Sequence, residues 1–227
     1  MSVQERITFR QRQREVIRQT RVLLIPFLCL LLGVLIIKFL YTKEEIYYYV
    51  NGLHFAAGDV FFPLVTELGS TTMALLVIFV LLCVSYRKGF IAATGFVFTA
   101  GIGAILKQLF GAPRPKLFFE QALREIYYVK GVTVLSNHLS FPSGHSICAF
   151  TSATLLTYLV PRKAWGVLFL LLAMLVGYSR LYMSQHFFED VAMGASLGVF
   201  LTLFWVGWLD VQPFLQRPSW QRGLLKR

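Results

Sequence analysis

Three short clusters of polar and ionisable residues interrupt a sequence that is otherwise rich in long apolar runs. Ionisable side chains beside such runs are costly, and by default they suggest a functional site. The clusters are Lys107 with Arg114–Pro115, then Pro142–Ser143–Gly144–His145, and finally Ser179–Arg180 with His186 and Asp190. Each cluster has an ordinary explanation when it is taken alone, so its significance depends on whether the three meet.

The first two clusters suit an anion. Lys107 and Arg114 are cations near the end of an apolar run, although long side chains at helix ends also reach for the headgroup region without further function. The second cluster opens the next run, and Pro followed by small residues is a common helix start. Free N–H groups at a helix N-terminus bind anions, and His145 adds a titratable proton there.

The third cluster suits a nucleophile. His186 and Asp190 are four positions apart, so they share a face if a helix runs through both. A carboxylate on one imidazole nitrogen fixes the tautomer and leaves the other nitrogen nucleophilic, although an ordinary His–Asp helix cap explains the pair equally well. If all three clusters converge, their two histidines, one carboxylate and three cations suit phosphoryl transfer, which relies on positioning and electrostatic stabilisation.

The apolar runs predict the helices that position these clusters. Hydrophobic residues make up 56% of the 227 residues, against roughly 45–50% in soluble domains. A membrane span needs about 20 apolar residues. Six runs approach this length: residues 22–40, 68–86, 89–106, 141–160, 164–179 and 191–209. The sequence therefore predicts an all-α, polytopic membrane protein with a six-transmembrane-helix bundle over residues 22–209.

The net charge of +11 is distributed unevenly. With both termini in the cytoplasm, the inside segments are 1–21, 87–88, 161–163 and 210–227, which hold 14 of the 22 basic residues but 3 of the 11 acidic ones. They carry the whole net charge, which fits the positive-inside rule and supports the short fifth run as a span. All three clusters then lie on the outer face. We expect no nucleic-acid partner, because the charges lie between apolar runs and form no single patch.

The remaining segments predict a membrane surface. Residues 1–21 are Arg-rich and can form an amphipathic surface helix. They resemble the start of a signal peptide, but the run that follows is too long and lacks a cleavage site, so we expect an uncleaved first span. Residues 41–67 are rich in aromatic side chains, which predicts an interfacial outer helix. Residues 210–227 are expected to form a cytoplasmic tail.

The three clusters together resemble the signature of the type 2 phosphatidic acid phosphatase (PAP2) superfamily, which includes bacterial lipid phosphate phosphatases and vanadium haloperoxidases. That signature reads Lys-x6-Arg-Pro, then Pro-Ser-Gly-His, then Ser-Arg-x5-His-x3-Asp. Every position is matched in order between Lys107 and Asp190. A match to three separate motifs is far more specific than a match to one.

The resemblance implies a role for each motif residue. His186, oriented by Asp190, would attack phosphorus and form a phosphohistidine, and His145 would protonate the leaving oxygen. The phosphate oxygens would be held by five residues: Lys107, Arg114, Ser143, Gly144 and Arg180. The sequence shows no carboxylate cluster suited to Mg²⁺, and its cysteines lack metal-ligand spacing, so no metal or other cofactor is expected.

The function that we expect is hydrolysis of a membrane lipid phosphate at the periplasmic face of a bacterial inner membrane. By resemblance, the candidate substrates are undecaprenyl pyrophosphate, phosphatidic acid, phosphatidylglycerol phosphate and the phosphates of lipid A. Two alternatives stay open, a lipid phosphotransferase that uses the same site and a lipid-binding or transport protein without turnover. The predicted spans argue against a haloperoxidase, because those members of the superfamily are soluble.

Overall fold

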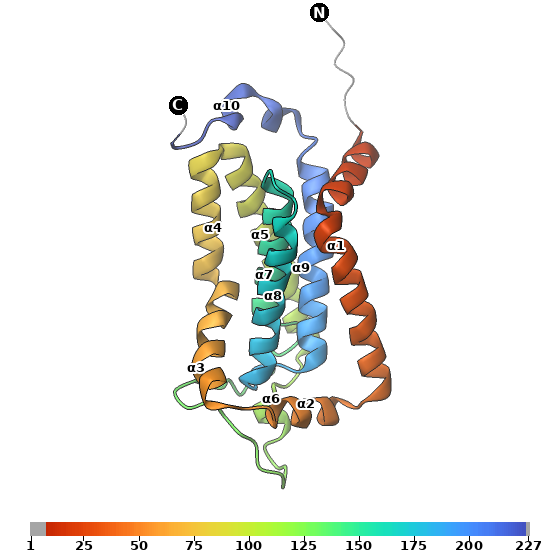
Figure 1. The fold of residues 1–227 in the computed structure, drawn as a ribbon, viewed down its shortest axis with the longest axis vertical. Helices are drawn as coiled ribbons and strands as arrows, with labels where there is room; N and C mark the ends of the chain where they lie inside the picture. Colours follow the sequence, from red (N-terminus) through yellow and green to blue (C-terminus); the bar gives the residue numbers. More distant parts are fainter. Residues whose placement is uncertain (1–7, 226–227) are drawn as a thin grey trace, which may run out of the picture.

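The computed structural model describes residues 8–225, and its long helices run side by side along one axis (Figure 1). Every regular element in this range is helical. Four segments are long and apolar enough to cross a membrane: Phe9–Leu40, Tyr86–Phe118, Trp165–Tyr182 and Phe188–Leu209. A fifth candidate is the pair Ala56–Gly69 and Thr71–Val84, which is bent by 51° at its break. The chain is therefore an all-helical, multi-pass membrane protein, as predicted.

Helix α7 (Gly144–Leu159) packs against α5 (Tyr86–Phe110), α8 (Trp165–Tyr182) and α9 (Phe188–Leu209). Twelve of its 16 residues are buried, so it is the central helix of this group. At 16 residues it is about 24 Å long, which is shorter than any of the four single candidate spans, of 18 to 33 residues. The six-helix count stays a prediction, because it requires this short helix to cross the bilayer.

Helix α1 (Phe9–Leu40) begins well before the first predicted run. Its basic first turns pack against the bundle, where Arg12 pairs with the buried carboxylate of Asp210 at 3.4 Å. The described part of the N-terminal basic segment is thus a continuation of α1 and not a separate surface helix. Residues 1–7 of that segment lie outside the described residues.

Residues 41–67 do not form the single interfacial helix that we predicted. Helix α2 (Lys43–Asn51) lies across the ends of the long helices, whereas α3 (Ala56–Val65) already runs along them (Figure 1). A 3-10 turn (Thr66–Gly69) joins α3 to α4 (Thr71–Val84). The second predicted run is therefore only the later half of a bent pair, because the polar residues of this turn interrupt the apolar pattern. The interfacial position of α2 stays a prediction.

Two glycines allow α9 to approach α7 closely. A Cβ atom on Gly194 would lie 2.6 Å from the carbonyl oxygen of Ser143, and one on Gly198 would lie 2.8 Å from that of Ile147. In both cases the obstacle is backbone, which cannot move aside as a flexible side chain can. This contact places Asp190 beside the start of α7, where its carbonyl accepts the N–H of Ser143 at 2.9 Å.

The end of the bundle where α1 begins is tied together by Asp210. This carboxylate is fully buried, pairs with Arg12 and Arg87, and accepts a hydrogen bond from Tyr158 at 2.6 Å. The chain continues through a 3-10 turn (Pro213–Gln216) into α10 (Pro218–Gln221) at the same end (Figure 1).

Candidate active site

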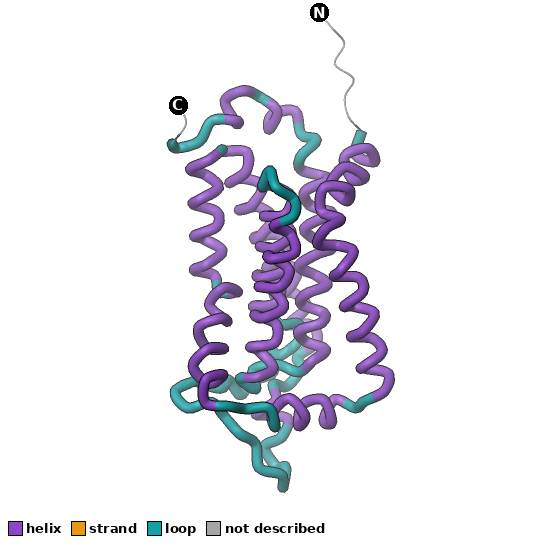
Figure 2. Tube along the Cα trace, viewed as in Figure 1, coloured by secondary structure: helices purple, strands orange, loops and turns teal. Residues whose placement is uncertain are grey.

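The three motifs meet at the opposite end of the bundle, where α2 and the short helix α6 (Pro115–Phe118) lie (Figure 1). The long loop between α6 and α7 gathers at this end as well (Figure 2). The carbonyl oxygen of Leu139 in that loop accepts hydrogen bonds from Lys107 at 2.7 Å and from Arg114 at 3.5 Å. The loop therefore joins the two cations of the first motif.

His186 lies in the turn between α8 and α9 and is buried. Its Nδ1 atom is 3.4 Å from Oδ2 of Asp190, and its Nε2 atom is 3.4 Å from Nη1 of Arg114. A carboxylate only accepts hydrogen bonds and a guanidinium only donates them. Both contacts therefore pair a donor with an acceptor when the neutral ring carries its proton on Nδ1, which leaves the lone pair on Nε2.

The surroundings of His186 favour this neutral form. Burial lowers the pKa of His186 to about 3, and the positive charges of Arg114 and Arg180 act in the same direction, while the hydrogen bond with Asp190 opposes them. The imidazole is therefore neutral at neutral pH, with a free lone pair on one nitrogen, as a nucleophile requires.

Asp190 reaches His186 in a different way from the one predicted. Helix α9 begins at Phe188, so no helix runs through both residues. Asp190 instead lies in the first turn of α9 and caps that helix, accepting the backbone N–H of Phe187 at 2.8 Å. The same carboxylate oxygen faces Nδ1 of His186. The sequence allowed two interpretations of Asp190, a helix cap and a partner of His186, and the structure shows that Asp190 does both.

Arg114 is buried and held in place by the surrounding loops. Its Nη1 atom donates to the carbonyl of Gln185 at 2.8 Å, and its Nε atom donates to Oδ1 of Asn137 at 3.0 Å. These bonds fix a positive charge next to Nε2 of His186, which is where a phosphate under attack would lie.

Arg180 is buried in the last turns of α8. Its Nη1 atom donates to Oγ1 of Thr66 at 2.8 Å, but its Nε atom is buried without a hydrogen-bond partner among the described residues. A buried charge with an unpaired donor is costly unless a counterion completes its shell. The position therefore favours a bound anion.

The second motif opens α7 as the sequence predicts. Ser143 is the N-cap residue, and its hydroxyl oxygen accepts hydrogen bonds from the N–H and the hydroxyl of Ser146 at 3.4 Å and 3.0 Å. Both bonds use lone pairs of Ser143, so its own hydroxyl proton stays available for an acceptor. A Cβ atom on Gly144 would lie 3.9 Å from Cε of Lys107, which shows that the lysine side chain passes beside the helix start.

A groove of about 650 Å³ between α4, α5 and α7 ends at these residues. Lys107, Gly144 and His145 line one end of it, and the rest is lined largely by apolar or small side chains such as Ala100 and Val97. The groove therefore has a cationic residue at one end and largely apolar walls along the rest of its length.

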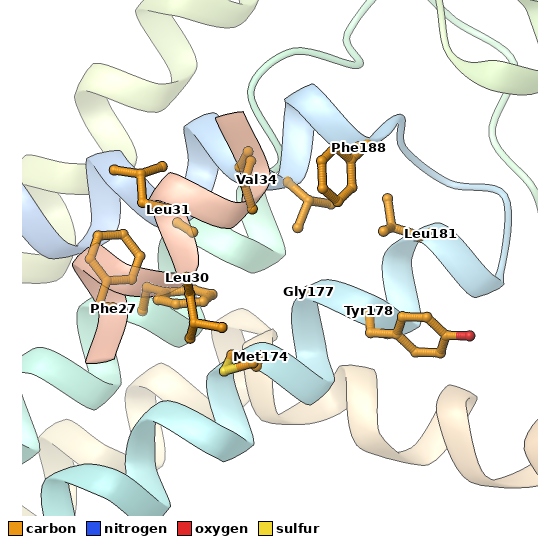
Figure 3. Close-up of a pocket in the computed structure, with 13 residues that line it drawn as sticks. Phe27, Leu30, Leu31, Val34, Met174, Gly177, Tyr178, Leu181 and Phe188 are labelled. Atoms are coloured by element: carbon orange, nitrogen blue, oxygen red, sulfur yellow. The ribbon is translucent and has the colours of Figure 1, made fainter. Parts of the chain in front are cut away.

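A second groove, of about 200 Å³, lies between α1, α8 and α9 (Figure 3). Its lining includes Phe27, Leu31, Met174 and Phe188, and it contains no basic or acidic side chain. The second groove therefore lacks the cationic end that the first one has.

Several polar contacts of the site involve residues outside the motifs, and three come from side chains distant in the sequence from their partners. Ser140 donates to Oδ2 of Asp190 at 2.5 Å, Asn137 holds Arg114, and Thr66 holds Arg180. They belong to loops or to the bend before α4, and no spacing in the sequence marks them. Of the three, only Ser140 lies near a motif in the sequence, two residues before Pro142, and this position could have suggested that it belongs to the site.

The described residues contain no group of three or more His, Cys, Asp and Glu side chains that could hold a metal ion. The charged groups around His186 that could face a phosphate are instead the cations of Arg114 and Arg180.

Comparison with known sequences gives one family and two partial relatives. The protein-family model described as PAP2 superfamily matches residues 88–213, which is more than half of the chain. An undecaprenyl-diphosphatase of Sulfolobus acidocaldarius is 38% identical over 73 residues, which cover 32% of this chain and 32% of the relative. The bacitracin transport permease protein BcrC of Bacillus licheniformis is 43% identical over 65 residues, which cover 29% and 31%. The aligned part thus spans about a third of either relative.

Two solved structures share the fold over most of their length. LpxE of Aquifex aeolicus superposes with a TM-score of 0.59 and 25% identity, covering 72% of this chain and 93% of that one. A transmembrane PAP2 type phosphatidylglycerolphosphate phosphatase of Bacillus subtilis gives a TM-score of 0.61 and 25% identity, covering 86% and 98%.

Proposed function

Because the chain belongs to the PAP2 superfamily, we propose that it is an integral membrane phosphatase that hydrolyses a lipid phosphomonoester or diphosphate. The observation that carries this proposal is the contact of His186 with both Asp190 and Arg114. A neutral imidazole thereby lies between a carboxylate that orients it and a cation that would hold its target, which is the arrangement that phosphoryl transfer needs.

The first step of the proposed reaction forms a phosphohistidine. Nε2 of His186 attacks phosphorus, the bond between phosphorus and the lipid oxygen breaks, and His145 gives a proton to that oxygen. Asp190 balances the positive charge that the phosphorylated ring acquires.

In the second step, water attacks phosphorus and the bond between phosphorus and Nε2 breaks. The proton of the water passes to His145, which restores both histidines to their starting state. Throughout, the phosphate oxygens would be held by the cations Lys107, Arg114 and Arg180, the hydroxyl of Ser143 and the N–H of Gly144. These cations supply the charge that a metal often provides, so the proposed reaction needs no metal ion.

The proposed arrangement in the membrane has six spans over residues 22–209, formed by α1, the bent pair α3–α4, α5, α7, α8 and α9. Residues 1–21 and 210–227 would lie in the cytoplasm, and the site would face the periplasm of a bacterial inner membrane. The distribution of charge supports this orientation, since the four segments that would lie in the cytoplasm carry the whole net charge of +11.

The groove beside α5 supports a lipid as the substrate. Its apolar length suits a hydrocarbon chain that enters sideways from the bilayer, and its end at Lys107 and His145 suits the phosphate. One relative is named for undecaprenyl diphosphate and one structural neighbour for phosphatidylglycerolphosphate. The proposed substrates are these two lipids, phosphatidic acid and the phosphates of lipid A.

Release of inorganic phosphate from this panel of lipids, by the purified protein in detergent with EDTA, tests the proposal. We expect release from at least one lipid, loss of that release in His186→Ala, and no loss in His138→Ala. His138 is an exposed histidine at the same end of the molecule, so it is a matched control. Complete dependence on added Mg²⁺ would contradict the metal-free reaction. Transfer of the phosphoryl group to a second lipid, without release of free phosphate, would identify a transferase instead.

A further inference from the structure

Ser140 is a fully buried residue of the loop before α7, and no motif includes it. Its hydroxyl donates to Oδ2 of Asp190 at 2.5 Å, and its Oγ atom is 3.5 Å from Nδ1 of His186. It therefore touches both members of the His–Asp pair but lies on the Nδ1 side of the ring, away from the nitrogen that would attack phosphorus.

One carboxylate oxygen of Asp190, Oδ2, contacts Ser140, Phe187 and His186. Oδ2 accepts the hydroxyl of Ser140 at 2.5 Å and the N–H of Phe187 at 2.8 Å, and it faces Nδ1 of His186 at 3.4 Å. Hydrogen bonds to a carboxylate stabilise its charged form and so reduce its tendency to take up a proton. The hydrogen bond from the hydroxyl of Ser140 is the shortest of the three contacts, and a substitution can remove it without changing the nucleophile.

We propose that Ser140 is a positioning residue that acts through Asp190 to keep the Nδ1 proton on His186 while the phosphohistidine is hydrolysed. This inference rests on the proposed function. In the second step, water forms a bond to phosphorus, the bond to Nε2 breaks, and the bonding electrons return to the ring. If Nδ1 keeps its proton, the leaving group is a neutral imidazole. If Asp190 has taken that proton, the ring would leave as an imidazolate anion, which is a much poorer leaving group.

The inference predicts a specific kinetic defect. Loss of the hydroxyl should slow hydrolysis of the phosphoenzyme more than its formation, so the phosphorylated form should accumulate during turnover. The defect should persist from pH 6 to 9, because the proton passes from Nδ1 to Asp190 within the buried pair and is not exchanged with the solvent. The KM for the lipid should not increase, because Ser140 faces the Nδ1 side of the ring and not the phosphate.

The test compares Ser140→Val with Ser140→Thr. The two side chains have nearly the same shape, but valine carries a methyl group where threonine carries the hydroxyl. With a ³²P-labelled lipid phosphate, kcat and the fraction of phosphorylated protein are measured from pH 6 to 9. We expect kcat to fall by about tenfold or more in Ser140→Val, as for loss of a hydrogen bond to a charged group, with accumulation of the phosphoenzyme. Ser140→Thr should restore both values relative to Ser140→Val. Ser85→Ala, which alters a buried serine at the other end of the bundle, should match the wild type.

The outcomes separate the two proposals. A wild-type protein that forms no phosphoenzyme and releases no phosphate would refute the proposed function itself. An active wild type with equal kcat and phosphoenzyme levels in Ser140→Val and Ser140→Thr would overturn only the role of Ser140. A lower kcat in Ser140→Val without accumulation, at every pH, would show a merely structural residue and would also overturn the inference.

Discussion

The buried turn around His186 sets the protonation state of the proposed nucleophile. The pKa of His186 is lowered to about 3, chiefly by burial, whereas an ordinary histidine titrates near 6.5. Because the folded-state pKa lies below the unfolded one, the stability that this group contributes is fully present above about pH 6.5 and is lost as the pH falls toward the folded-state value.

We therefore predict that His186 stays neutral in the free protein down to at least pH 5. The measurement is the ¹⁵N chemical shift of the imidazole nitrogens in histidine-labelled protein, with His186→Ala to assign the signal. The expected spectrum shows Nδ1 protonated and Nε2 bare between pH 8 and 5. A titration midpoint near 6.5 would mean that the ring is solvated and not enclosed by Asp190 and Arg114.

At this scale, the three motifs predicted that Arg114, His186 and Asp190 lie together, and the structure brings these side chains into contact. They did not predict Ser140 or Asn137. Both belong to a long loop without a periodic pattern, and their partners lie many residues away, at Asp190 and Arg114. Such pairings depend on how the loop folds over the bundle, which local sequence does not encode.

The elements that position the site depend on the close contact of α7 and α9. A methyl group on Gly198 would meet the backbone of Ile147 at 2.8 Å and that of Thr151 at 3.0 Å. Gly198→Ala should therefore destabilise the protein by about 1–3 kcal/mol, as overpacking commonly does, and should lower the activity by displacing α9.

Gly101→Ala is the control for this prediction, because a Cβ atom on Gly101 of α5 would meet nothing within 4 Å. Alanine is about 1 kcal/mol better than glycine inside a helix, so this variant should be as stable as the wild type or more so. Thermal unfolding in detergent measures both changes. Equal unfolding temperatures for the two variants would refute the close contact of α7 with α9.

Apolar periodicity and length predicted the middle of each long helix but not all of the ends. The first helix extends to Phe9 because Arg12 is paired with Asp210, so its basic turns pack as part of the bundle. The bent pair begins at Ala56. Its polar break at Thr66–Gly69 interrupts the apolar run, so the sequence pattern predicted only the helix after the break. In both cases a tertiary contact or a bend overrides the local pattern.

At the scale of the whole molecule, the groove beside α5 combines an apolar wall with a cationic end, whereas the groove between α1, α8 and α9 lacks the cationic end. We predict that Ala100→Phe, which partly fills this groove, raises KM several-fold for a long-chain lipid phosphate. The same change should not affect hydrolysis of a short-chain, water-soluble phosphate ester, because the phosphate site itself is untouched.

Ala192→Phe provides the matched control, since Ala192 lines the groove between α1, α8 and α9. Its kinetic constants should equal those of the wild type for both substrates. If Ala192→Phe raised KM for the long-chain lipid and Ala100→Phe did not, the lipid chain would have to lie in the second groove.

The most direct test of the proposed phosphatase is the chemistry of its phosphorylated intermediate. The protein is mixed with a ³²P-labelled lipid phosphate, quenched within milliseconds, and analysed by mass spectrometry of its peptides. A phosphoryl group on His186 that is stable in base, labile in acid and absent from His186→Ala is the expected result. A protein that releases phosphate at full rate without such a label, or that carries the label in His186→Ala, would contradict the mechanism.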